Sequence, residues 1–194
     1  MAEVAIEGGG EIRSDDANIS SAQREAAQRK IEKELFTSVM EGNWEKVVGF
    51  YKNESVPTKI NPAGDTILHL AILTGLESGV IKLMELMEEQ DKTRMEQFVQ
   101  TKNDWGNTPL HQAAFVGMVE VCEFIANQYR TQQVVQPRNN QGETPLHVAV
   151  LHGHIKVFCA LQTVNERKGW GAMDRKDGGN TILHSAIFRE HFGE

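Results

Sequence analysis

Gly106-Asn-Thr-Pro-Leu-His111-Gln-Ala113 decides the fold, because the chain carries closely similar copies of this phrase. The other copies are Gly64-Asp-Thr-Ile-Leu-His69-Leu-Ala71, Gly142-Glu-Thr-Pro-Leu-His147-Val-Ala149 and Gly179-Asn-Thr-Ile-Leu-His184-Ser-Ala186. Their histidines are 42, 36 and 37 residues apart (111−69, 147−111, 184−147). Repetition at such a period predicts a stack of similar units that bury their apolar faces against one another and leave an extended surface suited to binding.

Each copy also predicts local structure. The glycine that opens the phrase ends an Asn- or Asp-rich turn, where the chain can take a positive φ without steric cost. The threonine two residues later is a favoured helix N-cap. Pro109 and Pro145 occupy the first helical position, where no backbone donor is missed, and isoleucine replaces proline in the other two copies. A short helix therefore follows each threonine, and a second, apolar helix follows the next glycine, most clearly in residues 119–125 and 155–161.

The phrase at 106–113 and 142–149 resembles the hallmark of the ankyrin repeat family. The resemblance covers about residues 35–194 and implies an all-α solenoid whose units each contain a β-turn finger, an inner helix and an outer helix. The usual period of the family is 33, so these units carry about 9, 3 and 4 additional residues. By the same likeness, each repeat histidine hydrogen-bonds the backbone of a finger.

The predicted domain division follows from composition and alignment. Residues 1–20 are acidic and poor in aromatics, so we expect a disordered tail. Residues 21–194 form the repeat domain, with repeats at about 60–98, 102–136 and 138–172 and an incomplete repeat at 175–194. A degenerate capping repeat at about 21–57 is predicted because Leu35 and Gly42 align with Leu68 and Gly75 at an offset of 33 (68−35, 75−42). Its first helix should begin near Ser20.

The additional residues and the C-terminal end narrow the resemblance. Residues 88–94 are predicted to be a charged spacer, and residues 167–173 a glycine-rich loop that holds Trp170. Long inserts and Ile in place of Pro resemble plant ankyrin proteins that carry a C-terminal membrane domain of the PGG type, and that domain is not in this sequence. The last inner helix has no outer helix after it, so we expect a fragment of a longer protein.

Charge and composition exclude several classes of function. The formal net charge of −7 argues against a phosphate-backbone partner. No signal peptide and no stretch of about 18 apolar residues occurs, so we expect a cytoplasmic protein, lying at the cytosolic face of a membrane if the full-length protein has the suspected membrane domain. Cys122 and Cys159 lack metal-ligand spacing and are predicted to be buried, reduced side chains.

No motif predicts catalysis, a cofactor or a metal site. The four repeat histidines belong to separate stacked helices about 8–10 Å apart, whereas zinc ligands converge on one ion at about 2 Å. His152 and His154 form a local cluster, but no cysteine or carboxylate is near them in sequence. No phosphate loop, nucleophile elbow or paired-cysteine zinc signature occurs.

The sequence instead predicts a protein-binding surface along finger tips and inner helices. Trp105 is the sharpest candidate, because nothing in the repeat requires an aromatic at a finger tip, and tryptophan is enriched among interface hot spots. The position after each histidine gives Leu70, Gln112, Val148 and Ser185, and the fingers give Asp65, Asn107, Glu143 and Asn180. His152 and Trp170 complete the candidates. This mildly acidic surface suits basic or amide side chains.

Three hypotheses stay open at this stage. The chain is a protein-interaction module, or that module is the cytosolic part of a membrane-anchored signalling or stress-response protein. Alternatively, it is the regulatory repeat domain of an enzyme whose catalytic domain lies beyond residue 194.

Overall fold

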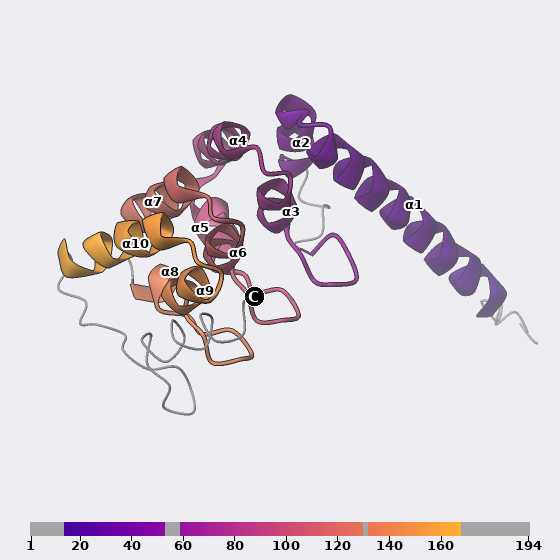
Figure 1. Cartoon of the computed structure of the whole chain (residues 1–194). Helices are drawn as coiled ribbons and strands as arrows, with labels where there is room; N and C mark the ends of the chain where they lie inside the picture. Colours follow the sequence, from indigo (N-terminus) through magenta and orange to yellow (C-terminus); the bar gives the residue numbers. More distant parts are fainter. Residues whose placement is uncertain (1–13, 53–58, 130–131, 168–194) are drawn as a thin grey trace, which may run out of the picture.

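The computed structural model describes residues 14–52, 59–129 and 132–167, and these residues form a row of packed helices without a β-strand (Figure 1). The helices are α1 (Ser14–Met40), α2 (Trp44–Tyr51), α3 (Ile67–Leu73), α4 (Glu77–Gln90), α5 (Lys92–Gln100), α6 (Pro109–Val116), α7 (Val119–Gln128), α8 (Gln132–Val135), α9 (Pro145–Leu151) and α10 (Ile155–Arg167). The predicted all-α repeat solenoid is therefore confirmed.

The start of each inner helix follows the predicted pattern. Thr66, Thr108 and Thr144 are the N-caps of α3, α6 and α9. Their extended backbone turns the chain into the helix, and the hydroxyls of Thr66 and Thr144 accept hydrogen bonds from the His69 and His147 N–H groups, which a helix start leaves without a partner. Pro109 and Pro145 occupy the first helical position. Three fingers precede these helices, and we define them as residues 60–65, 102–107 and 138–143.

Stacking generates one continuous core. The inner helices α3, α6 and α9 contact one another in order, and so do the outer helices α4, α7 and α10. The apolar side chains between the two layers are fully buried, among them Leu68, Leu83, Leu110 and Ile125. Each unit therefore depends on its neighbours for the burial of its apolar surface, as expected of a repeat array.

The first unit consists of α1 and α2. Leu35 and Val39 of α1 are fully buried, α1 contacts α2 and α3, and α2 contacts α4. These are the contacts that an inner and an outer helix make elsewhere in the stack. The N-terminal part of α1 extends away from the other helices (Figure 1). The helix begins at Ser14, not near Ser20, so residues 14–20 do not belong to a disordered tail; Ser and Asp are favoured residue types at a helix start, and the sequence has them at 14–16.

The prediction of a charged spacer at 88–94 was wrong. Helix α4 continues to Gln90, and Asp91 then caps α5, its side chain accepting a hydrogen bond from Arg94 N–H at 3.0 Å. Helix α5 is docked, since its residues Met95 and Phe98 are buried. The Arg94 guanidinium lies 4.6 Å from the centroid of the Tyr51 ring and donates to the Tyr51 carbonyl. The charged residues of this stretch belong in part to the amphipathic helix α5, and Arg94 of this helix contacts Tyr51 of α2.

The structure tests the predicted burial of the two cysteines. Cys122 is buried as predicted, whereas Cys159 is exposed on α10, so the prediction for Cys159 was wrong. The loop around Trp170 and the incomplete repeat at 175–194 lie outside the described residues. Among the described helices, none combines the length and the apolar composition that crossing a membrane requires.

Candidate protein-binding surface

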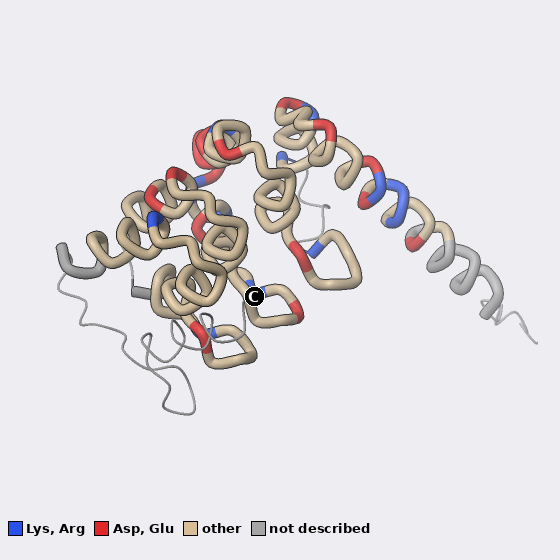
Figure 2. The backbone as a smooth tube through the Cα atoms, viewed as in Figure 1, with Lys and Arg blue, Asp and Glu red and all other residues tan. Residues whose placement is uncertain are grey.

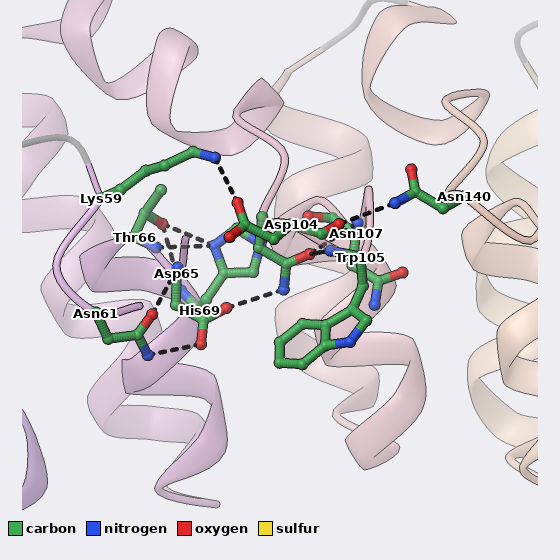
Figure 3. Close-up of polar contacts among 10 residues, drawn as sticks. Lys59, Asn61, Asp65, Thr66, His69, Asp104, Trp105, Asn107 and Asn140 are labelled. Carbon is green, nitrogen blue, oxygen red and sulfur yellow. Dashed lines mark hydrogen bonds and ion pairs between the residues drawn. The ribbon is translucent and has the colours of Figure 1, made fainter. Parts of the chain in front are cut away.

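His69 connects its own inner helix to the next finger. The Thr66 backbone N–H donates to His69 Nδ1 at 3.2 Å, so Nδ1 is the unprotonated ring nitrogen. The Nε2–H group then donates to the Asn107 carbonyl oxygen at 2.9 Å (Figure 3). One buried imidazole thus provides a hydrogen-bond partner both for the N–H group at the helix start and for a carbonyl group of the following finger.

His111 repeats this arrangement one unit later. Thr108 N–H donates to Nδ1 at 3.2 Å, and Nε2–H donates to the Glu143 carbonyl at 3.0 Å. Burial lowers the pKa of His69, and it lowers the pKa of His111 from 6.5 to about 4. Both rings are neutral at pH 7. The prediction that repeat histidines bond the finger backbone is confirmed at these two positions, and we call the two histidine–carbonyl bonds the histidine ladder.

Neighbouring fingers also bond directly to one another. Asp104 N–H donates to the Ala63 carbonyl, and Asn140 N–H donates to the Trp105 carbonyl, both at 3.0 Å. Because each finger is anchored by backbone bonds to the one before it, the row of tips is a defined surface and not a set of independent loops.

Polar side chains add a second set of finger-to-finger bonds. Asn103 Nδ2 donates to Asp65 Oδ1 at 2.9 Å, and Asn139 Nδ2 donates to Asn107 Oδ1 at 3.0 Å. Asp65 and Glu143 are 5 % and 6 % exposed, so these two candidates are not open contact residues. Their carboxylates are directed into the finger network, which needs acceptors; Asn107 is half-buried in the same network.

The candidates after each histidine also lie deeper than predicted. Val148 is 5 % exposed and Leu70 is 2 % exposed, while Gln112 is half-buried. This position faces the stack, because Leu70 and Val148 pack within the hydrophobic core. A partner cannot reach Leu70 or Val148, so their assignment to a binding surface was wrong.

The exposed position of each inner helix comes three residues later. Leu73 is 49 % exposed and Phe115 is 48 % exposed; Met40 occupies the aligned position of α1 and is 42 % exposed, and Leu151 of α9 is half-buried. We call these four residues the inner-helix row. Each lies four residues after the repeat histidine position, one turn further along the same face and beyond the reach of the finger. This spacing of four residues from the histidine can be read from the sequence, but the sequence-based prediction of the binding surface did not use it.

Phe115 is held in place within the row. Its ring makes an edge contact with the exposed His152 ring, with centroids 4.4 Å apart. His154 Nε2–H donates to the Phe115 carbonyl at 2.9 Å. The ring of His154 covers Gly117, where a Cβ would come within 2.6 Å of it. The predicted candidate His152 therefore lies beside the one aromatic side chain of the row.

Trp105 lies at the tip of the second finger with 59 % of its surface exposed (Figure 3). Its backbone is fixed on both sides, since its N–H donates to Asn103 Oδ1 at 3.1 Å and its carbonyl accepts from Asn140 N–H. A large exposed aromatic on a rigid backbone loses little conformational freedom on binding. Trp170 and Asn180 lie outside the described residues. In the described part of the chain, no three side chains are grouped so that they could hold a metal ion.

The geometry defines a class of protein: a helical repeat stack whose units are joined by fingers and by a histidine ladder. Residues 82–169 match the family model of ankyrin repeats in three copies, so this segment of the chain consists of ankyrin repeats. A search of curated proteins found no match. Ankyrin repeats are generally protein-interaction modules and are typically non-catalytic.

Proposed function

We propose that this chain binds a protein partner along the inner-helix row and over the tip of Trp105. The observation that carries the proposal is the recurrence of an exposed apolar side chain at one aligned position of successive inner helices. Single exposed apolar residues need no explanation, whereas a contiguous row of them indicates an interaction surface. Trp105 adds the residue type most often found at interface hot spots.

The decisive variant is the pair Leu73→Ser and Phe115→Ser. Partners are captured from a cell extract with the wild-type chain, identified, purified and titrated against wild type and variant by calorimetry. We expect affinity to fall by about 100-fold, because two centrally placed apolar contacts are removed (about 1.4 kcal/mol per tenfold). Both side chains are half-exposed, so the melting temperature should change little.

Ile155→Ser is the matched control, because Ile155 is 71 % exposed and lies outside the row. It should leave affinity unchanged. Trp105→Ala should weaken binding with an unchanged melting curve. A partner that binds the double variant as tightly as wild type would exclude the row as its docking surface.

The membrane-anchored form of this proposal rests on the plant-type resemblance described above. It is tested by the coding sequence that follows codon 194. Several apolar stretches of about 20 residues would support membrane anchoring. Kinase or ligase motifs there would favour the regulatory domain of an enzyme.

A further inference from the structure

The histidine ladder does not extend to α1. Alignment at an offset of 33 (69−36) places Phe36 where α3 and α6 have His69 and His111. The two histidines are buried, whereas Phe36 is 42 % exposed. A phenyl ring cannot donate a hydrogen bond to the first finger, so α1 is not joined to that finger as the later inner helices are joined to theirs.

The first finger also differs at its outer edge. Pro62 occupies the position of Asp104 and Asn140 (104−62 = 42, 140−104 = 36), whose N–H groups donate to the preceding finger. Proline has no N–H group, so the first finger has no backbone donor at the position from which the later fingers bond the preceding one. The same absence prevents a partner from extending the row through that bond.

A cleft of about 540 Å³ lies between α1 and the first finger. The lining residues Arg29, Lys33 and Phe36 follow one another at i, i+4 and i+7, on one face of α1. Lys59 and Pro62 line it from the finger side. The cleft adjoins the inner-helix row, because Phe36 lies one helical turn before Met40 on the same helix.

The charge of the cleft is opposite to that of the chain. Its side chains include three cations, Arg29, Lys33 and Lys59, against the single carboxylate of Glu32, while the chain carries −7. Two of the cations form exposed ion pairs: Arg29 with Glu25 at 3.8 Å, and Lys59 with Asp104 at 2.9 Å. Such pairs are worth about 1 kcal/mol or less, so the carboxylates of a ligand can replace them. Figure 2 shows the basic residues gathered on one stretch of α1.

We propose that this cleft docks an acidic segment of a partner protein, with an apolar side chain against Phe36 and Pro62 and carboxylates at Arg29 and Lys33. A basic segment would meet like charge. A nucleic acid, which has a continuous line of phosphates, would meet the net negative charge of the rest of the chain. A short acidic segment with one apolar side chain can contact Phe36 and at the same time pair its carboxylates with the cations of the cleft. The proposal is independent of the function assigned to the inner-helix row.

The test is a selection from a displayed library of random 16-residue peptides on the whole chain, followed by fluorescence anisotropy of the enriched peptides. We expect a class of acidic peptides with an apolar residue. Binding of this class should weaken about tenfold or more in Phe36→Ser and in Lys33→Glu, and should weaken as salt rises. The double variant Leu73→Ser and Phe115→Ser should leave the binding of these peptides unchanged. The cleft proposal and the inner-helix-row proposal can therefore fail independently of each other. Thermal melts establish that each variant is folded.

Three results would overturn the proposal. The first is a selection without any peptide that is sensitive to both Phe36→Ser and Lys33→Glu. The second is a sensitive class that is basic. The third is tighter peptide binding after removal of residues 1–13, which would assign the cleft to the chain's own N-terminal segment.

Discussion

The first unit and the middle units use aligned positions for opposite purposes. In α3 and α6, a threonine starts the helix and a histidine bonds the next finger. In α1, Lys33 and Phe36 stand at those positions (66−33, 69−36). Lysine does not cap a helix start, so α1 continues upstream to 27 residues where α3 has 7. The comparison shows that the first unit lacks both the threonine cap and the histidine bond of the middle units, and that it borders a cleft.

The largest effect should come from removing a ladder histidine. His111→Ala leaves a cavity and deprives Thr108 and the Glu143 carbonyl of a partner, so we expect the free energy of unfolding to fall by about 3–4 kcal/mol. Phe36→Ala, at the aligned exposed position, should cost less than about 1 kcal/mol. Urea denaturation of both variants measures the contrast. Equal losses would mean that the ladder does not distinguish the two regions.

Acid should weaken the middle units through the same residue. The pKa of His111 is about 4 when folded and 6.5 when unfolded, so the unfolded state binds more protons as the pH falls through this window. The stabilisation is complete above pH 6.5 and is lost on the way to pH 4, for a total of about 3 kcal/mol. His69 adds to the effect in the same direction.

Carboxylates also titrate near pH 4, so the measurement is the difference between wild type and His111→Gln. Unfolding free energies at pH 4–7 should converge for the two proteins as the pH falls, because only wild type loses the histidine contribution. Parallel curves would contradict a neutral, buried His111.

The smallest single effects are expected for glycines of the two regions. Gly106 has φ of 76°, and a Cβ there would lie 2.4 Å from Asn140 Oδ1 and 2.7 Å from its backbone nitrogen. Gly106→Ala should therefore destabilise by about 2 kcal/mol, partly by separating the fingers. Gly49 of α2 has nothing within 4 Å, so Gly49→Ala should stabilise by about 0.5–1 kcal/mol. Thermal melts with opposite shifts are the expected result; a neutral Gly106→Ala would exclude strain at the finger.

Prediction of the fold from the sequence succeeded where one residue acts on its near neighbours. Threonine caps, Pro at the first helical position and glycines with positive φ are local, and in the three described copies they lie where the repeated phrase places them. Prediction failed where burial depends on a distant element. Residues 88–94 read as charged, yet Arg94 is placed by Tyr51, 43 residues earlier (94−51).

The candidate surface was predicted in part for the same reason. Trp105 could be chosen by its residue type alone, because no repeat requirement explains it, and it is exposed. Asp65 and Glu143 are polar finger residues and were expected at the surface, but both are buried, Asp65 against Asn103 of the next finger and Glu143 against Asn139 of its own. Whether a polar side chain faces solvent or a neighbouring unit depends on stacking, which a single unit does not contain.

By itself, the sequence determined the repeat architecture and the positions of the described fingers and of helices α3, α6 and α9. These follow from capping, turn chemistry and a repeated phrase, all of which act within one unit. Only the tertiary structure decided that the insert at 92–100 docks as a helix and that a cleft separates α1 from the first finger. These depend on contacts between units, and the energy of a repeat stack resides in those contacts.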